Sequence, residues 1–305
     1  MPQAGYIAWH PMYAHPLPEG HRFPMLKYEL LPEALRYEGI AVAGDFFEPE
    51  EVPEEVILLT HTEDYWSNMR ELRLSAREMR AIGFPLSSQL VERERRITQG
   101  TIDCALYALA NKSVALNIAG GTHHAFADRG EGFCLLNDFA VAANYLLHTG
   151  MAKQILIVDL DVHQGNGTAA IFRHEPRVFS YSMHGQHNYP FHKEQSDQDI
   201  GLVDGIEGAS YLQILRDTLP SLLDKLQPDI VFYLSGVDVL QTDKFGKLAL
   251  TIADTAARDH FVFSQCRMRN IPVAVSMGGG YSPQIKDIVA AHVNTFRAAS
   301  ELWDR

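Results

Sequence analysis

The segment at residues 155–167, ILIVDLDVHQGNG, constrains the fold of this chain more than any other part of the sequence. It begins with an apolar run that is typical of a strand buried on both faces of a parallel sheet. Asp159, Asp161 and His163 then occupy alternate positions, and alternate side chains of an extended strand point the same way. We therefore expect two carboxylates and an imidazole to converge at the carboxyl end of the strand, where open parallel sheets bind ligands.

These three side chains carry donor atoms that suit a divalent metal. Carboxylate oxygens and an imidazole nitrogen are ligands of Zn²⁺ and of similar ions. The alternative is a strand that ends in a polar loop whose acids are solvated. The spacing alone leaves both interpretations open.

The order of the expected elements predicts the fold class. The chain has 305 residues, enough for one large α/β domain or two small ones. Strands and helices alternate throughout, without a repeat or a low-complexity linker. We expect helices at residues 26–39 and 101–115, mostly helical structure over 54–100, and an irregular loop over 185–205. The pattern predicts one doubly wound α/β domain over residues 1–305, with a central, mainly parallel sheet flanked by helices.

Composition narrows the function and the location. Lys and Arg total 26, Asp and Glu total 38, and the formal net charge of −12 argues against a nucleic-acid partner. The three cysteines have no metal-ligand spacing, which favours a reducing compartment without disulfides. We find no pattern of a signal peptide and no apolar run of membrane-spanning length, so the expected location is cytoplasmic, with no membrane partner. The sequence does not indicate the oligomeric state.

Three further strand ends carry polar side chains. His123 and His124 follow a strand and a glycine pair, Asp238 lies at the end of the strand expected over residues 229–240, and Tyr281 follows three glycines. In a parallel sheet these ends lie at one edge. Each also has an ordinary interpretation, because adjacent histidines can bond within a loop and a lone aspartate often caps a helix. Phe133 lies in a glycine-rich loop without an obvious core to fill, which favours the wall of a pocket.

Taken together, these motifs resemble the histone deacetylase family, the metal-dependent deacylases with an arginase-like fold. The resemblance extends from about His15 to Tyr281, and its form is closest to the class IV branch and bacterial relatives. It is carried by the motifs HPLPEGHR, GGTHHAFADRGEGFCLLND, DLDVHQGNG, SGVDVL and GGGY.

The resemblance implies two cation sites. Asp161, His163 and Asp238 would ligate one Zn²⁺ per chain and leave a position open for water and the substrate carbonyl. Fe²⁺ accepts similar ligands, so the metal used in the cell stays open. A structural K⁺ would lie close by, on oxygens supplied by Asp159, Asp161, His163, Ser182 and Met183. His184, His187 and His192 follow no known ligand spacing, which argues against a further metal site there.

The resemblance also implies catalytic roles. His124 would take the proton of the zinc-bound water and return it to the leaving amine. His123 would act by electrostatics, oriented by Asp159, and Asn166 would be the partner of His124. Tyr281 would donate a hydrogen bond to the oxyanion.

The substrate would enter through a tunnel. Phe133 and Tyr189 would flank it, together with Gly132 and Gly279, and Arg22 would lie by an inner cavity where the released carboxylate leaves.

The sequence departs from the family pattern at three places. Asn166 stands where many members have an aspartate, so His124 would be stabilised less as imidazolium. Tyr189 replaces a phenylalanine and makes the tunnel wall more polar. The loop at residues 82–88, IGFPLSS, has no acid to serve as the rim aspartate that holds the substrate backbone.

The leading hypothesis is a zinc-dependent hydrolase that removes acetyl or longer acyl groups from lysine side-chain amides. One alternative is a deacetylase of small amines such as acetylpolyamines, and another is a catalytically silent module that binds acyl-lysine. The intact set of ligands, histidines and Tyr281 argues against silence. An arginase-type manganese hydrolase would need more ligand aspartates, and no G-x-S-x-G motif offers a serine nucleophile.

Overall fold

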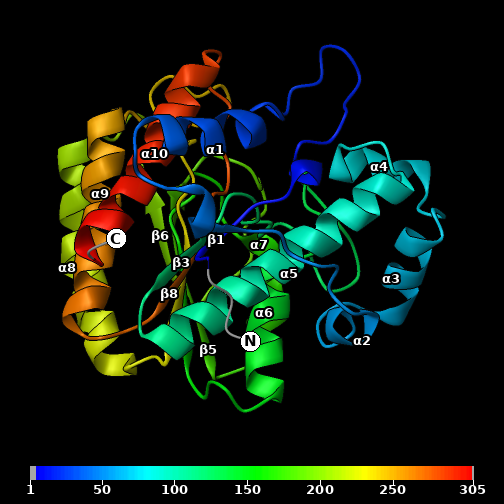
Figure 1. Cartoon of the computed structure of the whole chain (residues 1–305), viewed down its shortest axis with the longest axis horizontal. Helices are drawn as coiled ribbons and strands as arrows, with labels where there is room; N and C mark the ends of the chain where they lie inside the picture. Colours follow the sequence, from blue (N-terminus) through cyan, green and yellow to red (C-terminus); the bar gives the residue numbers. More distant parts are fainter. Residues whose placement is uncertain (1–4, 304–305) are drawn as a thin grey trace.

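Eight parallel strands form one continuous sheet in the computed structural model, which describes residues 5–303 (Figure 1). The ends of the expected domain, residues 1–4 and 304–305, lie outside the described residues. The sheet order is β2-β1-β3-β8-β7-β4-β5-β6. The strands are β1 (Ile7–Ala8), β2 (Phe46–Phe47), β3 (Val114–Asn117), β4 (Ile155–Asp159), β5 (Val178–Gly185), β6 (Gln198–Leu202), β7 (Ile230–Leu234) and β8 (Val273–Ser276).

The four central strands, β3, β8, β7 and β4, are buried along their whole length. Their apolar sequences suit this position, because helices cover both faces of the sheet. The pairing register aligns the ends of neighbouring strands, so the segments that follow all leave the sheet at one edge. The aligned last residues are Asn117, Ser276, Leu234 and Asp159.

Helices cover both faces, as expected for a doubly wound sheet. Helices α1, α8, α9 and α10 lie on one side of the sheet, and α5, α6 and α7 lie on the other (Figure 1). No helix among the described residues has the length and apolar character of a membrane span. The helices are α1 (Lys27–Tyr37), α2 (Glu54–Ile57), α3 (Glu63–Arg70), α4 (Ala76–Ile82), α5 (Ser88–Asn111), α6 (Asp138–His148), α7 (Asn166–Phe172), α8 (Gly208–Leu226), α9 (Ile252–Met268) and α10 (Ile285–Leu302), with 3₁₀ turns η1 (Pro11–Tyr13) and η2 (Ala43–Asp45).

The helix expected at residues 101–115 is only part of a longer one. Helix α5 runs without a break from Ser88 to Asn111, and β3 begins at Val114. Gly100, which looked like a boundary, lies inside the helix. A Cβ at Gly100 would lie 2.6 Å from the Tyr13 hydroxyl and 3.0 Å from the Asn117 amide, so glycine allows α5 to pack closely on the sheet here.

The irregular loop expected over residues 185–205 contains an edge strand. Strand β6 pairs in parallel with β5, and its exposed and less exposed residues alternate. Such a strand has few apolar residues because one of its faces is open to water. The absence of an apolar run hid it in the sequence.

Candidate active site

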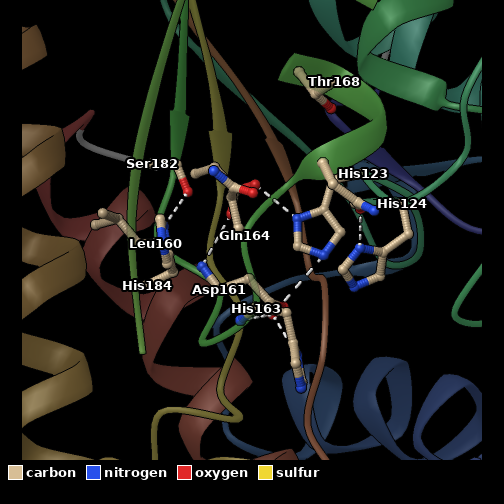
Figure 2. A network of polar contacts seen from close by, with 12 residues as sticks. His123, His124, Leu160, Asp161, His163, Gln164, Thr168, Ser182 and His184 are labelled. Atoms are coloured by element: carbon tan, nitrogen blue, oxygen red, sulfur yellow. Dashed lines mark hydrogen bonds and ion pairs between the residues drawn. The ribbon is translucent and has the colours of Figure 1, made fainter. Parts of the chain in front are cut away.

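Three buried metal-ligand side chains meet beyond two adjacent central strands. Asp161 and His163 follow β4, and Asp238 follows β7. One donor atom from each lies within 4.8 Å of the others, and all three side chains are buried. Figure 2 shows Asp161 and His163 beside the imidazole of His123. Asp161 and His163 converge as expected, but the second carboxylate of the cluster is Asp238, whereas Asp159 contacts His123.

Backbone hydrogen bonds fix the two carboxylates. Oδ2 of Asp161 accepts a bond from the Gly279 amide at 2.8 Å, and Oδ1 of Asp238 accepts one from the Val162 amide at 2.9 Å. The other oxygens, Oδ1 of Asp161 and Oδ2 of Asp238, lie 3.0 Å and 3.1 Å from Nδ1 of His163. Each carboxylate therefore directs one oxygen toward the imidazole.

The electrostatics of this cluster fit a bound cation. Burial, reinforced by the nearby Asp161 carboxylate, raises the pKa of Asp238 to about 7. Burial opposes charge on His163 as well, yet hydrogen bonds to the same two carboxylates raise its pKa to about 10. Two carboxylates held together out of water need positive charge between them. With one imidazole they form a donor set that suits Zn²⁺ or Fe²⁺.

The adjacent histidines have different partners. Nδ1 of His123 lies 2.6 Å from Oδ2 of Asp159, the last residue of β4, whereas Nδ1 of His124 lies 2.7 Å from Oδ1 of Asn166, the first residue of α7. The ring centroids are 4.2 Å apart. In Figure 2 the two imidazoles lie side by side.

These partners give the two rings different charges. Burial acts against the charged form of His123, but the Asp159 carboxylate overcomes it and raises the pKa to about 9. Burial, together with repulsion from His123 and His163, holds the pKa of His124 well below its usual value. His123 is therefore cationic and His124 neutral at physiological pH, so His124 is the ring that can accept a proton.

Tyr281 is held at the same edge by the loop after β8. Its backbone amide donates to Oδ2 of Asp243 at 2.5 Å. Burial raises the pKa of the hydroxyl well above its usual value, so the group stays protonated and can donate a hydrogen bond. The preceding Gly279 packs tightly, because a Cβ there would lie 2.0 Å from Oδ2 of Asp238.

A pocket of about 520 Å³ leads from the surface to these side chains. Phe133, Tyr189 and Gly132 line it, whereas Gly279 lines a smaller inner cavity of about 40 Å³. Phe133 has a positive φ of 69°, a strained conformation for an aromatic residue. Its amide donates to the Ile82 carbonyl at the end of α4, over 2.7 Å.

The placement of Arg22 by the inner cavity is wrong. Arg22 is exposed at the outer mouth of the larger pocket, with its guanidinium 5.5 Å from the centroid of the Phe245 ring. The neighbouring Phe23 points inward and lines the inner cavity instead. The arginine at that cavity is Arg93 of α5, which is buried and donates through Nε to the Tyr13 carbonyl at 2.8 Å.

Besides Arg93, the charged residues Lys27 and Glu131 lie near the site and were not singled out from the sequence. Lys27 is buried at the start of α1, and its Nζ donates to the Gly278 carbonyl at 2.9 Å. Burial lowers the pKa of this lysine to about 8. Lys27 precedes the apolar Leu31 and Leu35 at intervals of four residues, which places it on the buried face of the helix. This spacing can be read from the sequence.

The second is Glu131, which links the tunnel wall to the histidine pair. Its Oε2 accepts bonds from the Tyr189 hydroxyl at 2.9 Å and from the Asn166 amide at 3.4 Å. Its Oε1 accepts one from Nε of Arg129 at 2.9 Å. The motif that contains Glu131 does not predict that it contacts Asn166.

The residues expected to hold a monovalent cation lie on neighbouring strands. Asp159 of β4 is the register partner of Ser182 of β5, and Met183 follows in the same strand. The Ser182 hydroxyl lies 2.9 Å from Nδ1 of His184 (Figure 2). His187 is exposed and pairs with Asp204 at 3.2 Å. In residues 5–303, Asp161, His163 and Asp238 form the one group with metal-site geometry.

The family model and the similar proteins point to the same family. The model of the histone deacetylase domain matches residues 21–296. An uncharacterised protein of Picosynechococcus sp. is 43% identical over 97% of this chain and 99% of its own length. Histone deacetylase 2 of Arabidopsis thaliana is 29% identical over 88% of this chain and 72% of its own.

A solved structure of an HDAC homolog complexed with SAHA superposes with a TM-score of 0.84, at 24% identity over 99% of this chain and 84% of that one. This likeness shows the fold, and the family match extends over the strand ends that carry the clustered side chains. The chain belongs to the histone deacetylase family and is a hydrolase of the deacetylase type.

Proposed function

We propose that this hydrolase is metal-dependent and removes acyl groups from lysine side-chain amides. The observation that carries the proposal is the meeting of a buried ligand set, a neutral histidine and a protonated tyrosine at the base of one open pocket. Amide hydrolysis needs an activated water, a donor for the oxyanion and an acid for the leaving amine. The pocket holds a candidate for each of these tasks.

The metal ligands in this proposal are Asp161, His163 and Asp238, with Zn²⁺ as the expected ion. When bound, the ion supplies Lewis acidity, which polarises the amide carbonyl and activates the attacking water. Ser182 and Met183, with Asp159 nearby, belong to the proposed structural K⁺ site.

The protein's own residues move the proton and stabilise the charge. His124 accepts a proton from the attacking water as the C–O bond forms, and it later delivers that proton to the departing amine as the amide C–N bond breaks. The cationic His123 stabilises the developing negative charge. Tyr281 donates its hydroxyl hydrogen to the oxyanion, and Phe133 and Tyr189 enclose the alkyl stem of the substrate. The products are a carboxylate and a free amine.

A substrate panel tests the proposal. The protein is assayed for release of carboxylate from peptides that contain Nε-acetyl-lysine or longer Nε-acyl-lysines, and from N-acetylputrescine. We expect turnover of acyl-lysine peptides, and none by His124→Ala. Turnover of the acetylpolyamine alone would favour the small-amine alternative. Binding of acyl-lysine without turnover by the metal-loaded wild type would favour the silent module.

A further inference from the structure

The mouth of the active-site pocket is basic, although the whole chain carries a formal net charge of −12. Four cationic side chains line the pocket of about 520 Å³, and no aspartate or glutamate is among its lining residues. The cations come from three separate parts of the chain. They are Arg22 from the segment before α1, Arg80 from α4, and Lys244 and Lys247 from the segment after β7.

Three of these four cations have no acidic partner. In the described part of the chain, no carboxylate oxygen lies within 4.0 Å of a cationic nitrogen of Arg22, Arg80 or Lys244, and all three side chains are exposed. Lys247 is partly neutralised by Asp204, whose Oδ2 lies 3.9 Å from its Nζ.

Some other exposed arginines of the protein pair with an acid, whereas Arg77 and Arg216 have no carboxylate oxygen within 4.0 Å among the described residues. Arg177 pairs with Glu175 at 2.6 Å, and Arg70 pairs with Glu54 at 2.5 Å. What distinguishes the mouth is therefore that its cations gather around one pocket whose lining residues include no acid.

We propose that the substrate is an acyl-lysine within an acidic polypeptide segment, whose flanking carboxylates contact the cations at the mouth. This inference rests on the proposed function, because an acyl-lysine at the base of the pocket leaves its neighbouring residues at the entrance. The loop at residues 82–88 adds no acid that would repel such a segment. Phe191, which is 84% exposed at the same mouth, offers an apolar contact to the polypeptide.

The same charges disfavour cationic substrates. An acetylpolyamine keeps at least one ammonium group, which the cations at the mouth would repel. A lysine-rich peptide would meet the same repulsion. Exposed ion pairs contribute about 0.2–1 kcal/mol each, which corresponds to roughly a 1.5- to 5-fold effect for one charge. Two or three such contacts together give a selectivity of roughly 2- to 100-fold, with about tenfold near the middle of this range, and it falls as salt is added.

The experiment compares matched acetyl-lysine peptides. One carries glutamates on both sides of the acetyl-lysine, a second carries glutamines at the same positions, and a third carries lysines. The ratio of kcat/KM between the acidic and neutral peptides is measured at low salt and near 0.5 M salt for wild type, Arg80→Glu, Lys244→Glu and Lys225→Glu. Lys225 is an exposed cation near the end of α8 that does not line the pocket, so its reversal is the matched control.

We expect the wild type and Lys225→Glu to prefer the acidic peptide about tenfold at low salt, with a smaller ratio at high salt. Arg80→Glu and Lys244→Glu should each reduce or invert the ratio. Equal rates on the acidic and neutral peptides would overturn the inference while leaving the deacylase proposal intact. Absence of turnover on every acyl-lysine peptide would contradict the proposed function itself.

Two further measurements test whether the pocket binds other anionic ligands. Free Nε-acetyl-lysine, which has one carboxylate of its own, should be a poorer substrate than the acidic peptide. If the two are equal, the partner is a small anionic amide and the polypeptide assignment is wrong. A single-stranded oligonucleotide is tested as an inhibitor of the same reaction. If it inhibits more strongly than the acidic peptide does as a competitor, the partner is a nucleic acid and the polypeptide assignment is wrong.

Discussion

His124 donates the hydrogen on its Nδ1 to Oδ1 of Asn166 across 2.7 Å. Because an amide oxygen is only an acceptor, this bond fixes the tautomer and leaves Nε2 of the ring as the proton acceptor. The Asn166 amide nitrogen is in turn 3.4 Å from Oε2 of Glu131, so this carboxylate contacts Asn166 rather than His124. The arrangement orients the base without giving it a directly bonded negative charge.

Replacement of Asn166 by Asp tests this arrangement. In the wild type, burial and the neighbouring histidines hold the pKa of His124 well below its usual value, so the ring is neutral over the neutral pH range. A carboxylate at position 166 favours the imidazolium and raises that pKa. Only the neutral ring can accept the proton. When the pH is lowered, the variant should therefore lose activity at a higher pH than the wild type does. We expect the acidic limb of the kcat/KM profile to move upward by about 1–2 pH units.

The control for that experiment is Asn166→Ala, which removes the orienting bond without adding charge. It should lower kcat at all pH values and, because the bond to Asn166 itself raises the pKa of His124, move the limb downward rather than upward. If Asn166→Asp and wild type show the same limb while His123→Ala is inactive, the roles assigned to the two histidines are reversed.

Loss of the Tyr281 hydroxyl should impair catalysis without unfolding the protein. The hydroxyl is protonated in the pocket and its backbone is held by Asp243, so Tyr281→Phe removes only the donor. We predict a fall in kcat of about 10²–10³-fold, the scale for one oxyanion donor. The measurement is steady-state hydrolysis of an acetyl-lysine peptide together with thermal unfolding. Rates within a few-fold of wild type would show that another group donates the bond.

Gly279→Ala should weaken metal binding. The added Cβ would lie 2.0 Å from Oδ2 of Asp238 and 2.8 Å from Oδ2 of Asp161, so it would displace both carboxylates. We expect zinc affinity to fall by about 10–100-fold, as for other disturbed supports of metal ligands. Gly44→Ala is the matched control, because nothing lies within 4 Å of its added Cβ. Equal zinc content of the two variants after dialysis against a weak chelator would contradict the assigned ligand set.

His61 should make the fold sensitive to acid. Its Nε2 accepts a bond from the Asn137 amide at 3.1 Å, and burial lowers its pKa from 6.5 to about 4. Below pH 6.5 His61 becomes protonated in the unfolded chain, whereas it stays neutral in the folded protein until about pH 4. The free energy of unfolding therefore decreases between these two pH values. The full contribution is about 3 kcal/mol, and about 2 kcal/mol of it is lost by pH 5.

The check is urea unfolding at pH 7.5 and pH 5 for wild type and His61→Asn, which keeps an acceptor but does not titrate. The variant should lose about 2 kcal/mol less stability than wild type between these pH values. Equal losses would mean that His61 is not held neutral in the folded protein.

The metal-ligand set was predicted through the resemblance to a known family, which is carried by short motifs at strand ends. Asp161 and His163 follow one apolar strand, and a parallel sheet brings the end of the strand before Asp238 alongside them. The central sheet was confirmed for the same reason, since buried parallel strands are apolar along their whole length. Strand β6 was missed because an edge strand lacks that pattern.

What the sequence could not provide was the direction of individual side chains in irregular segments. Arg22 and Phe23 are neighbours, and only the conformation of the turn decides which of them faces the inner cavity. Glu131 reaches Asn166 because the loop after β3 folds back over α7, a long-range arrangement that no local periodicity encodes. The basic mouth likewise depends on bringing three separate segments together.

In the proposed mechanism, hydrolysis depends on a metal bound by Asp161, His163 and Asp238. The most direct test is the rate of acetate release from an acetyl-lysine peptide by chelator-stripped protein, before and after one equivalent of Zn²⁺ is added, with His163→Ala as the control. We expect background rates for stripped wild type, recovery when the ion is added, and no recovery for the variant. A stripped wild-type protein, verified to be free of metal, that hydrolyses the peptide at the original rate would contradict it.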